Sequence, residues 1–193
     1  MLGRRLARAM TMTADGRTMI KFGPYEVTEQ VFYTTGLSFA LVNLKPLTAG
    51  HVLVCPRAAH RRLQDLSATE TADLFGAVQL VQRVLTRSYL TSGSGGGFTV
   101  AVQDGPEAGQ TVPHVHVHVI PRIQGDTAAP DDIYVKMASE EGNVGGALWD
   151  RANRPKPGGG MPAVEDEDRE VRSPEQMRHE AERYRAVLRD LDR

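Results

Sequence analysis

Apolar residues along this chain follow two patterns, and the first of them is typical of β-strands. LSFALVN (37–43) and HVLV (51–54) are rich in apolar residues, and the Pro and Gly of KPLTAG (45–50) between them predict a hairpin. FTVAVQ (98–103) and HVHVHVI (114–120) have the same character. We expect these segments to pair in an antiparallel sheet of about five strands.

The second pattern places apolar residues at helical spacing in residues 67–90 and 173–191. Ser67 and Glu70 match a capping box at the start of the first segment. Ser173 suits an N-cap, and Pro174 suits the first position of the second helix. The apolar stripes are Leu74, Phe75, Val78, Val81 and Leu85 in the first segment, and Met177, Ala181, Tyr184 and Leu188 in the second. Strands and helices in this order predict an α+β fold in which both helices pack on the sheet.

Composition separates a folded unit from two segments of different character. Residues 1–19 contain four arginines and one acidic residue, a composition typical of an organelle transit peptide or of a disordered extension. Residues 138–172 are rich in Gly and Pro and include the acidic cluster EDEDRE, which predicts a solvated insertion. We therefore expect a folded domain over residues 20–137, on which the helix in residues 173–193 packs.

Overall composition excludes several classes of function. A hydrophobic fraction of 40% and a charged fraction of 24% are ordinary for a globular protein, and the net charge of −1 provides no general attraction for nucleic acid. A single cysteine, Cys55, excludes an intramolecular disulfide and favours a reducing compartment. No stretch approaches the ~20 apolar residues of a membrane span. SGSGGG (92–97) and DGPEAGQ (104–110) lack the lysine of a P-loop. We expect a cytoplasmic or nuclear protein, unless residues 1–19 direct it to an organelle.

Three histidines at alternate positions, His114, His116 and His118, are the main candidates for chemistry. On a strand they share one face, about 6.6 Å apart, while the intervening valines face the core. The row could be the polar face of a half-buried strand, or it could bind a metal, although nearby carboxylates to support metal-bound imidazoles are lacking. The third alternative is nucleophilic attack on phosphorus, because a neutral imidazole is a competent nucleophile near pH 7.

The histidine row and its flanks also resemble a known family. HVHVHVI resembles the motif of the histidine triad superfamily, and QDGPEAGQTVPHVHVHVIPR (103–122) is similar to its fragile histidine triad branch of dinucleoside polyphosphate hydrolases. Similar residues occur in 37–57, at the LSATETADLF helix start and in DDIY (131–134). The resemblance covers roughly residues 20–136 and the C-terminal helix.

The resemblance implies a homodimeric enzyme with the α+β fold of this superfamily, which hydrolyses diadenosine triphosphate to AMP and ADP through a covalent nucleotidyl-histidine intermediate. Mg²⁺ or Mn²⁺ would arrive with the substrate phosphates and would have no ligands from the protein. Two alternatives remain open: a nucleoside phosphoramidate hydrolase of the same superfamily, and a signalling module that binds dinucleotides and turns them over slowly.

The resemblance also implies roles for individual residues. His116 would be the nucleophile, and His118 would contact phosphate oxygens and assist the leaving nucleotide. His114 would accept a hydrogen bond from His116 through its backbone carbonyl, and His51 would hold His114. Gln103 would contact the bridging and leaving-group oxygens.

The remaining implied residues bind the substrate. Asn43 would contact ribose or phosphate, and Tyr134 would lie near the phosphates. Gln110 and Thr111, helped by the backbone of Gly109, would donate hydrogen bonds to non-bridging oxygens and so stabilise the charge that develops there.

Overall fold

The computed structural model describes residues 18–90, 95–126, 132–138 and 171–191. The expectations for the N-terminal extension, for the start of SGSGGG and for most of the insertion at 138–172 therefore fall outside the described residues. No helix in the described part of the chain combines the length and hydropathy needed to cross a membrane.

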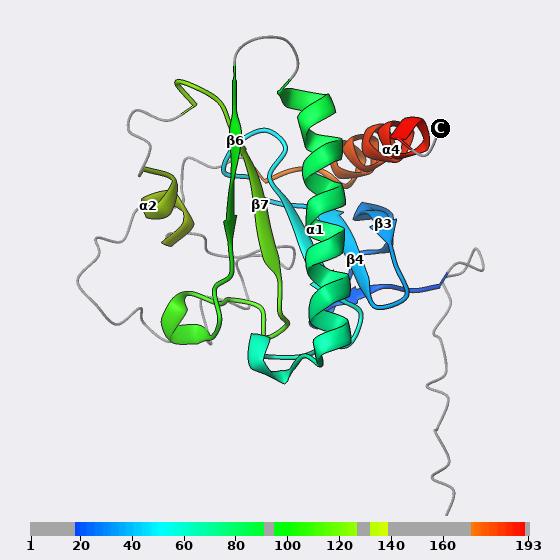
Figure 1. Ribbon diagram of the computed structural model, residues 1–193, viewed down its shortest axis with the longest axis vertical. Helices are drawn as coiled ribbons and strands as arrows, with labels where there is room; N and C mark the ends of the chain where they lie inside the picture. The colour runs from blue at the N-terminus through cyan, green and yellow to red at the C-terminus, as the bar shows by residue number, and fades with distance from the viewer. Residues whose placement is uncertain (1–17, 91–94, 127–131, 139–170, 192–193) are drawn as a thin grey trace, which may run out of the picture.

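A five-stranded antiparallel sheet forms the centre of the fold, as the hydrophobic pattern predicts (Figure 1). Every pair of neighbouring strands in it is antiparallel. From one edge to the other, the strands are β3 (Val31–Thr34), β4 (Ser38–Val42), β5 (Val52–Pro56), β7 (Val117–Arg122) and β6 (Gly97–Ala101). A separate small hairpin pairs β1 (Lys21–Phe22) with β2 (Tyr25–Glu26). Among the described residues, three single-turn 3-10 helices lie in connections: Thr28–Gln30, Leu63–Asp65 and Pro106–Ala108.

The histidine strand is shorter than the sequence predicts. Strand β7 begins at Val117, so His118 lies within the strand, whereas His114 and His116 precede it. The backbone of this segment bonds elsewhere: the His114 N–H donates to the Val112 carbonyl, and the Val115 N–H donates to the carbonyl of His60. The backbone of this segment is therefore bonded to the loop before α1, whereas the sequence predicts that it is bonded to a neighbouring strand.

Two long helices pack on one face of the sheet. Helix α1 (Ala68–Tyr89) begins with the predicted capping box of Ser67 and Glu70. Helix α4 (Pro174–Leu191) begins with a similar pair, because the N–H groups of Ser173 and Gln176 each donate to the other side chain. The shared core includes Leu74, Val78, Val81 and Leu85 of α1, Met177, Ala181 and Tyr184 of α4, and Val115, Val117 and Val119. Phe75, which was expected in the stripe, is 40% exposed.

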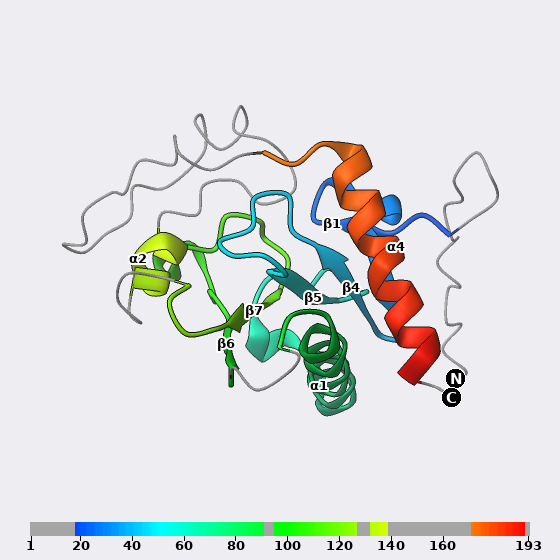
Figure 2. The ribbon, with the colours of Figure 1, turned by 90° about the horizontal axis from the view of Figure 1, so that it is seen from above.

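The opposite face of the sheet carries the imidazoles between two smaller apolar clusters. One cluster joins the β1–β2 hairpin to β4 and β5 and buries Cys55, whose thiol pKa is raised by burial. The other consists of Ile120 of β7 with Ile133 and Met137 of helix α2 (Asp132–Ala138). Figure 2 shows α1 and α2 on opposite sides of the sheet. The two long helices thus cover one face of the sheet, and the histidine side chains lie on the opposite face.

Candidate active site

The three histidines share one buried face, as their spacing predicts. Each has an exposed fraction of 1% or less, and the valines between them lie in the core on the other side. Phe22 of β1 packs against the rings of His114 and His116. The ring centroids of His116 and His118 are 4.9 Å apart, less than the roughly 6.6 Å that separates alternate residues along a regular strand.

His114 uses both ring nitrogens to bind backbone groups. The Gly23 N–H donates to Nδ1 over 3.0 Å, and Nε2 lies 2.8 Å from the Pro56 carbonyl oxygen. A carbonyl oxygen can only accept, so Nε2 carries the proton and Nδ1 carries the lone pair. Burial lowers the pKa of His114, which favours this neutral form. His114 is therefore a structural imidazole without a nitrogen to offer a substrate.

His116 has the opposite arrangement. Its Nδ1 lies 2.8 Å from the backbone carbonyl oxygen of His114, so Nδ1 donates and Nε2 carries the lone pair. This hydrogen bond is the one expected for the middle histidine. It orients the ring and selects the tautomer in which Nε2 is the nucleophilic nitrogen.

His51 fixes the tautomer of His118. The Leu47 N–H donates to His51 Nδ1 over 3.1 Å, so the proton of His51 lies on Nε2. That nitrogen is 3.0 Å from His118 Nδ1, to which it donates. The proton of His118 consequently lies on Nε2, and burial lowers the pKa of this residue to about 4, so the ring is neutral near pH 7.

The contact of His51 with His118 corrects the expectation that His51 holds His114. The register of β5 and β7 explains the difference, because Leu53 pairs with His118. His51 precedes Leu53 by two residues and so lies on the same face, toward the end of the pair at which β7 continues to Ile120. His114 lies toward the other end, near Pro56.

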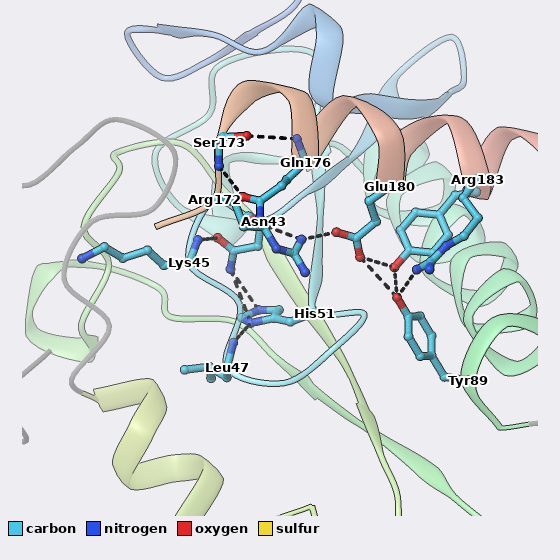
Figure 3. Close-up of polar contacts among 11 residues, drawn as sticks. Asn43, Lys45, Leu47, His51, Tyr89, Arg172, Ser173, Gln176, Glu180 and Arg183 are labelled. Carbon is cyan, nitrogen blue, oxygen red and sulfur yellow. Dashed lines mark hydrogen bonds and ion pairs between the residues drawn. The ribbon is translucent and has the colours of Figure 1, made fainter. Parts of the chain in front are cut away.

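Asn43 packs against the His51 ring and is fully buried. Its Oδ1 accepts a hydrogen bond from the Lys45 N–H over 3.2 Å, which orients the amide. Its Nδ2 is then 3.4 Å from both ring nitrogens of His51 (Figure 3). Asn43 therefore supports the His51 ring in this structure, and its contact with ribose or phosphate stays a prediction.

The loop between β6 and β7 brings Gln103 against the backbone of Gly109. Gly109 has a φ of 90°, and a Cβ there would lie 2.5 Å from Gln103 Nε2. Glycine thus permits both the turn and the close approach of the glutamine. Gln110 is bonded both within this loop and to the segment before α1, because its N–H donates to the Gly105 carbonyl and its side chain donates to the Arg61 carbonyl. Thr111 is half-buried and adjoins Val112, whose carbonyl accepts from His114.

Tyr134 lies on α2 and is 53% exposed. Its neighbour Ile133 packs on Ile120, two residues beyond His118, so α2 lies on the same face of the sheet as the histidines. A direct role for Tyr134 stays a prediction.

Sequence reasoning missed Phe22, Gly23 and Leu47, which touch the rings or set their tautomers. The Gly-Pro pair at 23–24 indicates a turn, but nothing in the sequence connects that turn to His114, 91 positions away. The contribution of Leu47 is a backbone N–H, which leaves no signal in the side-chain pattern.

A metal site at the histidine row was the second alternative that the sequence left open. Within the ranges that the structure describes, no three His, Cys, Asp or Glu side chains are grouped so as to bind a metal ion. His114 also engages both nitrogens in hydrogen bonds to the backbone.

Comparison with known proteins gives one family. The model of the HIT domain matches residues 25–125. The chain is 42% identical over 167 residues to an asymmetrical bis(5'-nucleosyl)-tetraphosphatase of Schizosaccharomyces pombe. This alignment covers 83% of this chain and 90% of that protein. The chain is 40% identical over 185 residues to a bifunctional bis(5'-adenosyl)-triphosphatase/adenylylsulfatase of Arabidopsis thaliana, in an alignment that covers 95% and 91%. The crystal structure of Plasmodium falciparum diadenosine triphosphate hydrolase in complex with cyclomarin A superposes with a TM-score of 0.63 at 26% identity, over 95% of this chain and 90% of that one.

Proposed function

The chain belongs to the histidine triad (HIT) family, and we propose that it is a hydrolase that cleaves diadenosine triphosphate and related dinucleoside polyphosphates, giving AMP and ADP from the triphosphate. The observation that carries this proposal is the hydrogen bond from His116 Nδ1 to the His114 carbonyl, which leaves a lone pair on Nε2 of a preoriented ring. Relatives that match most of the chain are named for this class of reaction.

The proposed first step is attack of His116 Nε2 on the α-phosphorus. The N–P bond forms while the P–O bond to ADP breaks, giving a nucleotidyl-histidine in which Nδ1–H remains bonded to the His114 carbonyl. That carbonyl stabilises the positive charge that the ring acquires. In the second step a water oxygen attacks phosphorus, the N–P bond breaks, and AMP leaves while the water proton goes to solvent. A covalent intermediate divides one difficult displacement into two easier ones.

His118 supports both steps as a neutral donor. Its Nδ1 accepts from His51, so the ring proton lies on Nε2, and this Nε2–H would donate to a phosphate oxygen. A donor placed where negative charge develops stabilises the transition state. Gln103, Gln110, Thr111 and the Gly109 backbone would supply further donors, for which the Gln110 side chain and the Gly109 N–H would have to turn from the Arg61 and Pro106 carbonyls to the substrate. Asn43 and Tyr134 would contact the bound nucleotide, and His114 would only position His116.

We propose that Mg²⁺ or Mn²⁺ enters with the substrate. The phosphates carry several negative charges, and burial favours the neutral forms of His114 and His118, so these two imidazoles provide little compensation. A divalent cation on the phosphate oxygens neutralises this charge without a dedicated protein site.

We also propose a homodimer. Strand β6 ends the order of the sheet, and Val100 on it is 40% exposed. An edge strand of this kind can pair with the same strand of a second copy about a two-fold axis.

The decisive experiment replaces His116 with Asn. We expect turnover of diadenosine triphosphate to fall by at least about 10⁴-fold, because the nucleophile is removed. The wild type, quenched in acid after mixing with substrate labelled at the α-phosphorus, should yield acid-labile label on the protein, and the variant should yield none. Near-normal turnover by H116N would contradict the proposal.

A substrate panel separates the related reactions. Diadenosine triphosphate, diadenosine tetraphosphate, adenylyl sulfate and adenosine phosphoramidate all present an adenylyl phosphorus to His116 and differ in the leaving group. Comparison of kcat/KM across the four identifies the preferred leaving group, and the Arabidopsis relative is the reason to include adenylyl sulfate. A slow rate on all four, together with tight binding of a dinucleotide, would favour the signalling alternative.

A further inference from the structure

A chain of buried and partly buried polar contacts runs from helix α4 to His51 (Figure 3). It begins at Arg172, the residue that lies just before Ser173 and α4. Arg172 is 129 positions from Asn43 in the sequence. The Arg172 N–H donates to the Leu44 carbonyl over 3.1 Å, and its guanidinium donates to the Asn43 carbonyl over 3.4 Å. The end of β4 is therefore attached at two consecutive carbonyls to the residue that leads into α4.

Glu180 fixes the position of the Arg172 guanidinium. It is buried on α4 and accepts from Arg172 through Oε2. Its Oε1 accepts from the hydroxyl of Tyr184 over 2.5 Å and from that of Tyr89 over 3.3 Å. Both carboxylate oxygens are thus engaged, and one of the tyrosines belongs to α1. The interface of the two long helices consequently determines where Arg172 lies.

At its other end the chain of contacts reaches the imidazoles. Arg172 holds the backbone of Asn43, whose amide lies against the His51 ring. His51 in turn donates to His118 Nδ1 and leaves the proton of His118 on Nε2. Each step is a direct contact, and the last one sets which nitrogen of His118 can donate to a phosphate.

We propose that Arg172 and Glu180 are positioning residues for His118, which they serve by holding Asn43 and thereby His51 in place. The inference rests on the hydrolase function proposed above. A charged pair with little exposure is expensive to desolvate, and hydrophobic replacements are often equally stable. The benefit of the Arg172–Glu180 pair is geometric here, because the pair fixes the backbone of Asn43, whose amide supports the His51 ring.

The test compares Arg172→Ala with Arg185→Ala. Arg185 lies on α4, the helix that Arg172 precedes, and likewise donates to backbone carbonyls, those of Glu29 and Val31, but these belong to another part of the fold. Three quantities are measured on the full chain: the melting temperature, kcat and KM for diadenosine triphosphate with Mg²⁺, and the ¹⁵N chemical shifts of the His51 and His118 rings.

We expect R172A to lower kcat by about 10- to 100-fold while KM changes little, because a displaced donor acts on the transition state. The ¹⁵N shifts of His118 should move from one tautomer toward a mixture. R185A should lower the melting temperature and leave kcat and the ¹⁵N shifts at their wild-type values. Glu180→Gln keeps the hydrogen bonds to the tyrosines but removes the charge, and should give a smaller change of the same kind.

Loss of stability in R172A without a change in kcat or in the ¹⁵N shifts would overturn the inference and leave Arg172 a purely structural residue. If R172A does not fold, E180Q decides on the same measurements. If the wild type fails to hydrolyse any dinucleotide, the proposed function fails, and the ¹⁵N comparison alone then decides whether Arg172 positions the histidines.

Discussion

The proton on each imidazole of the site is set by its neighbours in the fold. The backbone of Gly23 and Pro56 defines the tautomer of His114, and the carbonyl of His114 defines that of His116. For His118, the tautomer follows from the Leu47 N–H through His51. Three chemically identical side chains therefore differ in where they carry the proton, and these differences underlie the proposed roles of His116 as nucleophile and His118 as donor, because backbone groups have fixed donor and acceptor roles.

The depressed pKa of His118 makes a prediction about stability and pH. The folded-state value is about 4, whereas an unfolded His titrates near 6.5, so the unfolded chain binds more protons between these values. This contribution to the free energy of unfolding is complete above about pH 6.5 and is lost as the pH falls toward 4, by roughly 2–3 kcal/mol at pH 4.5.

His118→Gln isolates this contribution. Glutamine can accept from His51 and can donate to a phosphate, but it does not titrate. Urea unfolding of both proteins at pH 7 and pH 4.5 should show a smaller loss of stability in H118Q than in the wild type, and the difference cancels groups that titrate elsewhere. Equal losses in the two proteins would refute the assignment of a depressed pKa to His118.

At the scale of elements, the sequence predicts regular segments well and the histidine segment less well. The capping box of Ser67 and Glu70, the N-cap at Ser173, most of the apolar stripes and the β4–β5 hairpin follow from local patterns, because each depends on residues a few positions apart. Period two correctly places the three histidines on one face. The start of β7 could not be predicted, since it depends on where the Val115 N–H donates, and its acceptor is the carbonyl of His60 in a distant loop.

The loop between β6 and β7 carries a prediction of its own. Gly109→Ala introduces strain at a φ of 90° and places a methyl group on the Gln103 amide, which must move away. The strain should cost about 1–2 kcal/mol in stability. The displaced Gln103 donor should lower kcat by about tenfold, because catalysis is sensitive to misplacement of this order.

Gly125→Ala is the matched control for this change. Gly125 has a φ of 82°, but its Cβ would meet no atom within 4 Å. We expect a similar loss of melting temperature in both variants and a loss of kcat only in G109A. A comparable fall of kcat in the two variants would show that strain, and not the contact with Gln103, is responsible.

At the scale of the whole molecule, the site depends on segments that the sequence keeps far apart. The three histidines could be named from HVHVHVI, and the bond from His116 to the His114 carbonyl was expected from the family resemblance, but the partners of the His114 and His118 rings could not be predicted. The pairing of His51 with His118 depends on the register of β5 and β7, and the attachment of Asn43 to α4 depends on how two helices pack. Sequence patterns report the period of an element and its ends, whereas register and packing are decided by long-range contacts.

The exposed edge of the sheet gives the last prediction, which concerns assembly. If β6 pairs with β6 of a second copy, Val100→Glu places two carboxylates along the shared strands, and like charges across an edge oppose pairing. Sedimentation velocity at micromolar concentration should show a dimer for the wild type and a shift toward monomer for V100E. Leu37→Glu is the control, since Leu37 is similarly exposed but precedes β4 near the opposite edge of the sheet. A dimer that survives V100E but dissociates in L37E would assign the interface to the β3 edge, and a monomeric wild type would exclude the homodimer.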